Sequence, residues 1–195
     1  RIRLQSGWAK TETKQGVYDF AWLDQIIDGA IERSIEPWLE LSYGNLIYPG
    51  AGGTGLGQGL IQSEEGLAAW DRYVTAALRH YADRVTYYEI WNEADLKQHG
   101  QDMSKETTLA YSRLFVRTAE IVRREDPDAF VHGLALAGVS QTKVVATFMT
   151  YLAEHKKLHL LDGISFHGYP ENPDHGFDAI ARIRSLVDQY APGVV

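Results

Sequence analysis

Tyr87-Tyr88-Glu89-Ile90-Trp91-Asn92-Glu93 stands near the middle of the chain. It begins with large aromatic and β-branched side chains, a composition typical of a β-strand that is buried on both faces. It ends with an amide and a carboxylate side by side. In a parallel sheet this position is the carboxyl end of a strand, where α/β proteins place their functional groups. The stretch therefore predicts a buried parallel strand that delivers polar groups to a site.

On both sides of this strand, short apolar segments alternate with longer segments of helical periodicity. The expected strands cover residues 1–5, 35–42, 85–91, 129–136 and 163–166. The expected helices follow them and begin near Asp19, Ser63, Ser104, Lys143 and Phe177, the first three of these positions being N-cap residues. This alternation predicts an α/β fold with a parallel sheet and right-handed crossovers. Periodicity alone does not separate an open doubly wound sheet from a closed barrel.

The composition is that of one globular unit with a sizeable core. The chain has 195 residues, of which 45% are hydrophobic and 23% are charged. Its formal net charge of -7 predicts no nucleic-acid partner, because no basic patch is present to displace counterions from a phosphate backbone. The lack of cysteine excludes disulfides and thiolate metal sites. No apolar run reaches the roughly 18 residues of a spanning helix, so no membrane partner is expected, and the cellular compartment stays open.

Several motifs carry a resemblance to a known family. Trp91-Asn92-Glu93 at a strand end resembles the acid/base motif that ends the fourth strand of clan A glycoside hydrolases. Leu41-Ser42-Tyr43-Gly44-Asn45 is similar to the third-strand end of glycoside hydrolase family 39, whose known activities include β-xylosidase. Gln5-Ser6-Gly7-Trp8 looks like the second βα unit, and His167-x-Tyr169 matches the sixth strand. The resemblance implies a (β/α)8 TIM barrel, a retaining two-glutamate mechanism and a carbohydrate substrate, with no cofactor.

The same resemblance assigns residues 1–195 to part of a barrel, from its second strand to its sixth helix. A complete barrel of this kind runs to about 250 residues or more. The first strand, the last two βα units and the catalytic nucleophile are therefore expected outside this sequence. Val194-Val195 reads as the beginning of a further strand. We expect the rest of a longer polypeptide to complete the barrel; closure by a second copy, which would make an oligomer, is the less favoured alternative.

The resemblance implies that Glu93 is the acid/base and that Asn92 bonds the 2-hydroxyl of the sugar. In retaining enzymes the acid first protonates the departing oxygen and then, as a base, activates water. Strict alternation along a strand would aim these two neighbours in opposite directions. Both can face one site only if regular pleating breaks after the strand. Without the other motifs, Glu93 would read as a surface glutamate and Asn92 as a turn residue.

Further sugar contacts are expected at the ends of two other strands. By the same resemblance, His167 and Tyr169 orient the nucleophile and line the sugar site. Tyr43 and Asn45 are expected to contact the sugar, and Trp8 and Trp91 could add aromatic surface. For these last four residues a packing role is about as well supported by the sequence.

Other features of the sequence favour structural roles. Glu89 is expected to pair with Arg3 inside the barrel, because a lone buried carboxylate is too costly. The glycine-rich segment 49–59 lacks the Lys-Ser/Thr of a phosphate loop and reads as a surface or substrate-side loop. On the fourth strand, the small residues Gly133, Ala135 and Ala137 are expected to share the barrel interior.

Metal chemistry is not expected. Glu171, Asp174 and His175 follow the fifth strand closely, but their spacing matches no metal-ligand motif. A solvated loop is the better interpretation of this segment, and we expect no metal site.

The function expected from these observations is the retaining hydrolysis of β-linked sugars such as xylosides. Another clan A specificity, such as an endo-glucanase or a mannanase, is the close alternative, because loops decide specificity. A non-catalytic carbohydrate-binding barrel is an alternative from a different class. An open nucleotide-binding α/β domain is less favoured, because no phosphate loop follows any expected strand.

Overall fold

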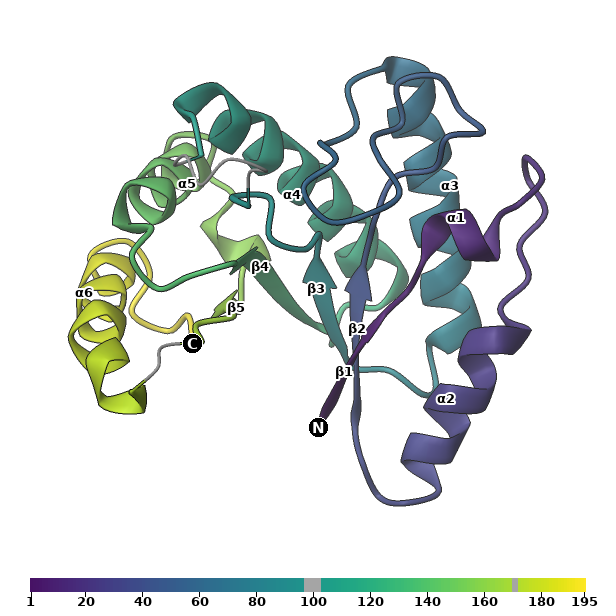
Figure 1. Ribbon diagram of the computed structural model, residues 1–195, viewed down its shortest axis with the longest axis horizontal. Coiled ribbons are helices and arrows are strands. Elements are labelled where there is room, and N and C mark those ends of the chain that lie inside the picture. Colours follow the sequence, from purple (N-terminus) through teal and green to yellow (C-terminus); the bar gives the residue numbers. More distant parts are fainter. Residues whose placement is uncertain (97–102, 170–171) are drawn as a thin grey trace.

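The computed structural model describes residues 1–96, 103–169 and 172–195, without the side chains of residues 173 and 175. One parallel sheet of five strands lies at its centre, and the strands are β1 (Ile2–Gln5), β2 (Pro37–Leu41), β3 (Tyr87–Ile90), β4 (Phe130–Leu136) and β5 (Gly163–Phe166). The helices are α1 (Trp8–Thr11), α2 (Ala21–Ile31), α3 (Glu64–Tyr81), α4 (Lys105–Glu125), α5 (Thr142–Glu154) and α6 (Phe177–Asp188), with 3-10 turns η1 (Leu158–Leu160) and η2 (Pro173–Gly176). Figure 1 shows α2 to α6 in an arc outside the strands, so helices cover one face of the sheet. We call the opposite face the inner face.

The strand order is that of a barrel segment. Neighbours in the sheet follow chain order from β1 to β5, and every pair is parallel. A doubly wound nucleotide-binding sheet reverses its order at the point where the ligand binds, and the described strands show no such reversal. Beyond β5, Val195 accepts a hydrogen bond from the Ile164 N–H at 2.9 Å and donates one to the Asp162 carbonyl oxygen at 2.8 Å. Residue 195 therefore adds to the sheet edge, as expected for the beginning of a further strand.

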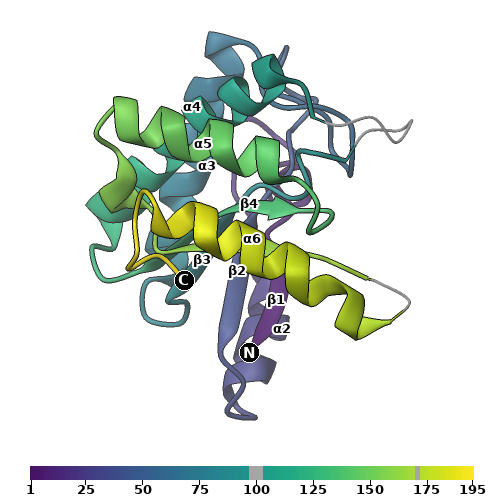
Figure 2. The same ribbon diagram turned by 90° about the vertical axis from the view of Figure 1, so that its left-hand side faces the viewer.

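The hydrophobic core lies between the sheet and the helices. Leu39, Tyr88 and Val131 occupy one register level of β2, β3 and β4, and all three are buried. Opposite them, each long helix presents one apolar face, for example Trp70 and Tyr73 of α3. Figure 2 shows α5 and α6 lying side by side in front of the strands. Among the described residues, no helix combines the length and apolar content needed to cross a membrane.

Two of the three expected helix caps are confirmed. The Ser63 Oγ accepts a hydrogen bond from the Gly66 N–H at 2.9 Å, and the Ser104 Oγ accepts one from the Thr107 N–H at 3.1 Å. Both bonds satisfy an N–H that the helix itself leaves unpaired. Asp19 is displaced by one position: α2 begins after Phe20, while the Asp19 Oδ1 accepts from the Ala21 N–H at 3.0 Å.

The expected interior position of Gly133 is wrong. A Cβ atom at this residue would lie 3.0 Å from the Phe115 ring of α4, so Gly133 faces the helices. The pairing of β4 with β5 is irregular between Gly133 and Leu136, and Leu134 and Ala135 have positive φ values of 72° and 40°. A bulge of this kind changes which side chains face inward, so simple alternation along the sequence fails in this strand.

Candidate active site

The carboxyl ends of the strands surround a cavity of about 610 Å³. Its walls come from segments that are far apart in the sequence, and they include Arg3, Tyr43, Thr54, Asn92, Glu93 and His167. Figure 1 shows the loop between β2 and α3 beyond the arrowheads of β2 and β3, where it forms one side of this region. We call this space the polar cavity. The sheet thus brings the side chains predicted from three separate motifs to one place.

Asn92 and Glu93 both reach the polar cavity because the strand conformation stops at Ile90. Trp91 and Glu93 have φ values of 66° and 46°, in the left-handed region that residues other than glycine seldom adopt. The Glu93 N–H donates to the Ala135 carbonyl oxygen at 2.9 Å, which holds the turn against β4. The expected break in pleating is confirmed.

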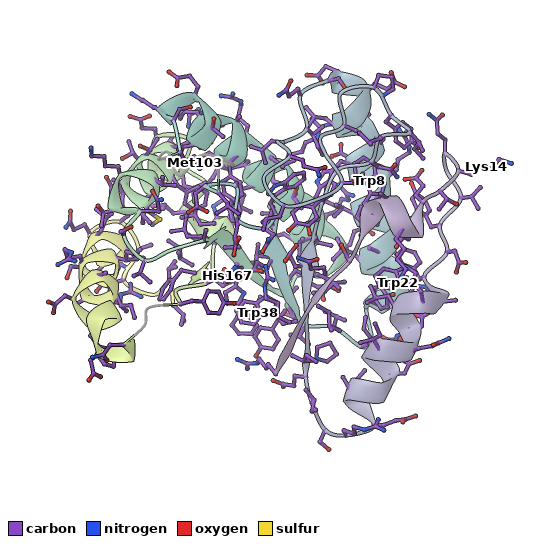
Figure 3. The ribbon with its side chains drawn as sticks, in the orientation of Figure 1. Trp8, Lys14, Trp22, Trp38, Met103 and His167 are labelled. Carbon is purple, nitrogen blue, oxygen red and sulfur yellow. The ribbon has the colours of Figure 1, made fainter. Side chains whose placement is uncertain are left out.

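His167 contacts Glu93 directly. Its Nδ1 lies 2.8 Å from the Glu93 Oε1, and Figure 3 shows His167 near the end of β5. The other ring nitrogen, Nε2, is buried and has no partner in the described part of the chain. Glu93 Oε2 also lacks a hydrogen-bond partner among the described residues. Within the described residues His167 therefore contacts the expected acid/base, and its expected role in orienting the nucleophile stays a prediction.

Asn92 is fixed from two sides. Its Oδ1 accepts a hydrogen bond from the Arg3 Nη2 at 2.7 Å, and its Nδ2 donates to the Tyr43 hydroxyl at 2.6 Å. The side chain is only 5% exposed. Burial raises the pKa of Tyr43, and the nearby Glu40 carboxylate adds to this effect, so the hydroxyl stays protonated at neutral pH. The amide is therefore held in one orientation at the cavity wall.

Below Asn92, a buried ion cluster consists of Arg3, Glu40 and Glu89. The Arg3 Nε donates to the Glu89 Oε2 at 2.5 Å, as the sequence predicted, and its Nη2 contacts the Glu40 carboxylate. Ser165 donates to the Glu89 Oε1, and Ser42 donates to Glu40. Both carboxylates are fully buried.

Glu40 is the member of the buried ion cluster that the sequence analysis missed. Burial raises its pKa to about 7, against the opposing effect of the Arg3 charge. It faces Glu89 in the strand register. The signal available in the sequence was a single carboxylate inside the otherwise apolar run Pro37-Trp38-Leu39-Glu40-Leu41.

Asn45 is not brought to the polar cavity. It is buried under the loop that follows β2, where its Nδ2 donates to the Glu12 carbonyl oxygen at 2.8 Å and its Oδ1 accepts from the Ile47 N–H at 3.2 Å. Both ends of the amide bond to backbone groups of residues 12 and 47. The structure therefore gives Asn45 a structural role in place of the expected sugar contact. β2 ends at Leu41, and the turn that follows directs the Asn45 side chain toward the backbone of residue 12.

The aromatic candidates divide between the core and the cavity mouth. Trp8 is buried, stacks on Tyr48 and Tyr73, and donates through Nε1 to the Glu12 Oε2 at 2.5 Å. Trp91 is buried against Trp70. Both indoles thus pack in the core, although Trp8 also lines the polar cavity and Trp91 lines a second, smaller space. Tyr169, by contrast, borders the polar cavity and is 91% exposed, so its ring is accessible to a ligand.

Asp95 is a further buried carboxylate near Glu93. Both of its oxygens accept from the Ala137 N–H, at 2.9 and 3.1 Å. Burial raises the pKa of Asp95, and the proximity of Glu93 adds to this effect. Asp95 thus ties the turn after β3 to the end of β4, and no motif in the sequence indicated this.

Glu171, from the expected solvated loop, lies outside the described residues, and so does the side chain of His175. Within the described ranges, no group of three histidine, aspartate or glutamate side chains is arranged to hold a metal ion.

Comparison with known proteins places this geometry in a family. The sequence model of "Glycosyl hydrolases family 39" matches residues 6–186. A β-xylosidase of Geobacillus stearothermophilus is 25% identical over 170 residues, which are 81% of this chain and 32% of that enzyme. The chain thus spans about a third of the length of this curated relative.

The solved structures that resemble this chain agree on its fold. A family 39 β-xylosidase from Caulobacter crescentus aligns with a TM-score of 0.74 at 22% identity, over 99% of this chain and 44% of that one. A xylanase from Paenibacillus barcinonensis aligns with a TM-score of 0.67 at 18% identity, over 94% and 59%. The fold is an α/β TIM barrel, of which the described residues form a part. On the match of the family model to most of its length, this chain belongs to glycoside hydrolase family 39.

Proposed function

We propose that this chain provides the acid/base side of the active site of a retaining glycoside hydrolase that cleaves β-xylosides. The observation that carries the proposal is the pair formed by Glu93 and His167, 2.8 Å apart at the edge of a 610 Å³ polar cavity. The relatives named above as β-xylosidases support xylosides as the substrate class.

In this mechanism Glu93 acts twice. It first donates a proton to the oxygen that joins the sugar to its leaving group, and the bond from this oxygen to the anomeric carbon breaks. A second carboxylate attacks that carbon and forms a glycosyl-enzyme intermediate. Glu93, now a carboxylate, then removes a proton from the water that releases the sugar.

His167 supports both steps by occupying one oxygen of Glu93. We assign the ring hydrogen to Nδ1, because a carboxyl oxygen 2.8 Å away accepts it in either protonation state of Glu93. Oε2, which has no partner among the described residues, then faces the substrate and holds the transferable proton. His167 is thus a positioning residue that fixes the rotation of the carboxyl group.

Asn92 is placed to bond a hydroxyl of the bound sugar. Arg3 and Tyr43 fix its amide from opposite sides, so little conformational freedom remains to be lost when the sugar binds. Hydrogen bonds to the 2-hydroxyl strengthen in the transition state. Tyr169 and Tyr43 provide further surface at the cavity wall.

We further propose that the remaining strands and the nucleophile belong to a longer polypeptide. Residues 1–195 would supply the second to the sixth βα unit, and the nucleophile would follow on the seventh strand. In a retaining enzyme its carboxyl group is expected about 5 to 5.5 Å from that of Glu93.

The test is Glu93→Ala in the full-length enzyme, assayed on xylosides with poor and with good leaving groups. We expect kcat/KM for an alkyl xyloside to fall by about 10²- to 10⁴-fold, because its alcohol needs the acid. For 2,4-dinitrophenyl xyloside, whose leaving group departs without a proton, we expect only a small loss. Glu65→Ala is the matched control, because Glu65 is an exposed glutamate of α3.

Three outcomes would contradict the proposal in different ways. An equal loss for both substrates would make Glu93 structural. A wild-type enzyme that cleaves glucans or mannans but no xyloside would show a different specificity. Sugar binding without any hydrolysis would show a non-catalytic carbohydrate-binding barrel.

A further inference from the structure

A second, smaller space borders Glu93. It has a volume of about 200 Å³, and its lining consists of Gly57, Gly59, Leu60, Trp91, Glu93, Ala94, Leu96 and Thr107. We call it the apolar hollow. Glu93 lines both this hollow and the polar cavity, so this residue lies at the boundary between the two spaces.

The two spaces differ in chemistry. The polar cavity presents a guanidinium, an amide and an imidazole, from Arg3, Asn92 and His167. The apolar hollow presents mainly the hydrocarbon side chains of Leu60, Ala94 and Leu96, beside the Thr107 hydroxyl. Leu96 is 37% exposed. A ligand that covers this side chain removes apolar surface from water, which favours binding.

The glycine-rich loop contributes to both spaces. Residues 54–56 line the polar cavity, whereas Gly57 and Gly59 line the apolar hollow. The loop is folded onto itself: the Gly53 N–H donates to the Gly59 carbonyl oxygen at 3.3 Å, and the Gly44 N–H donates to the Gly53 carbonyl oxygen at 2.7 Å. One short loop, anchored after β2, therefore separates a polar space from an apolar one.

Glycine is required at the hollow by the backbone conformation. Gly59 has a φ of 93°, which residues with a Cβ atom seldom adopt. A Cβ atom there would meet nothing within 4 Å. The wall of the hollow at this point is therefore bare backbone, and the space in front of it stays open.

We infer that the apolar hollow binds an apolar leaving group, a single aromatic ring or a short alkyl chain, of a glycoside whose sugar occupies the polar cavity. The inference rests on the proposed function. The proton moves from Glu93 to the oxygen between sugar and leaving group, and the electrons of the broken bond stay on this oxygen. The leaving group departs as an alcohol or phenol, while the nucleophile carboxylate bonds to the anomeric carbon. The acid must therefore stand between sugar and leaving group, and Glu93 has this position between the two spaces.

The size of the hollow limits what it binds. Sites for drug-sized ligands begin at about 300 Å³, so 200 Å³ accommodates one ring or a short chain. Its wall is mainly hydrocarbon, and its Thr107 hydroxyl already shares a hydrogen bond with the Ser104 hydroxyl at 3.0 Å. It therefore offers few partners for the hydroxyls of a second sugar, whose burial without hydrogen bonds is unfavourable.

The test compares benzyl β-xyloside with 2-hydroxyethyl β-xyloside in the full-length enzyme. Both leaving groups are primary alcohols, but only benzyl alcohol is apolar. We expect the ratio of their kcat/KM values to favour the benzyl compound and to fall roughly tenfold in Leu96→Asn. Because Leu96 is partly exposed, the substitution should not prevent folding. Inhibition by free xylose, which needs only the polar cavity, should not change.

Two further variants keep the result unambiguous. Leu60→Ala alters another part of the wall and should lower the same ratio. Leu46→Asn changes a leucine that is 73% exposed on the loop after β2, and it should leave the ratio unchanged. An unchanged ratio in both wall variants, or an equal loss for both substrates, would overturn the inference while leaving the proposed function intact. A wild-type enzyme that hydrolyses neither compound nor any aryl xyloside would refute the proposed function itself.

Discussion

Glu89 and Glu93 are four residues apart at the same strand end, yet they lie in different surroundings. Glu89 is fully buried, with Oε1 bonded by Ser165 and Oε2 bonded by Arg3. Glu93 shares Oε1 with His167 and leaves Oε2 without a partner in the described residues. A carboxylate with both oxygens occupied can hold the inner face together but cannot act on a substrate. Position along the strand, rather than residue type, thus separates the structural from the proposed catalytic glutamate.

The comparison is sharpest when each glutamate is removed in turn from the full-length protein. We expect Glu89→Ala to lower the free energy of unfolding by about 3 to 5 kcal/mol, because it leaves Arg3 with one buried partner fewer. Glu93→Ala should lower it by less than about 1 kcal/mol, since Glu93 has one hydrogen bond beside an open cavity. Urea unfolding measures both values.

Glu65→Ala is the control for that experiment and should change the free energy of unfolding by no more than about 0.5 kcal/mol. If Glu93→Ala destabilised the protein as much as Glu89→Ala, the distinction between the structural and the proposed catalytic glutamate would be lost. Glu93 would then belong to the same structural cluster as Glu89.

Glu40 makes the contribution of the buried ion cluster to stability depend on pH. Its pKa is raised by burial from 4.5 to about 7, so between these values the folded protein binds a proton that the unfolded chain releases. The stability contributed by protonated Glu40 is therefore fully present below about pH 4.5 and is lost as the pH rises through 7. The charged groups that face it are Arg3, which opposes the shift, and Glu89, which adds to it.

We expect Glu40→Gln to remove this pH dependence. Glutamine mimics the protonated carboxyl, so the free energy of unfolding of the variant, relative to the wild type, should rise by up to about 3 kcal/mol between pH 5 and pH 8. Urea unfolding of the full-length protein at both pH values measures the change, and Glu65→Gln should show none. A constant difference between Glu40→Gln and the wild type would mean that Glu40 keeps its ordinary pKa in the folded protein.

The sequence was most informative where a local physical rule acts alone. Ser63 and Ser104 were identifiable as caps because a hydroxyl before a helix has one obvious task, to accept from a free N–H. The pairing of Glu89 with Arg3 followed from the cost of burying a charge. The five strands followed from short apolar or alternating segments, and their ends differ from the expected ones by at most two residues.

The sequence was least informative where the backbone leaves regular geometry. Gly133 was assigned to the wrong face because a bulge in β4 interrupts alternation. Asn45 was expected in the site because it follows a strand, but the loop turns its amide to the backbone of residues 12 and 47. Glu40 was overlooked although it is the single carboxylate in the apolar run of β2. Only the strand register shows that it faces Glu89 and shares its partner Arg3.

Tyr43 offers the smallest and most selective test of the comparison, because it acts on Asn92 from the cavity side while Arg3 acts from the buried ion cluster. Tyr43→Phe removes the hydroxyl that accepts from the Asn92 Nδ2 at 2.6 Å. One such hydrogen bond is worth about 0.5 to 1.5 kcal/mol, so kcat/KM for xylosides should fall by about 2- to 10-fold, while urea unfolding changes little. Tyr190→Phe is the matched control: it removes a bond of 2.9 Å to the Thr150 hydroxyl, between α5 and the end of α6, and should leave activity unchanged. If Tyr43→Phe reduced stability and not activity, Tyr43 would belong with the buried ion cluster and would have no part in positioning Asn92 for the sugar.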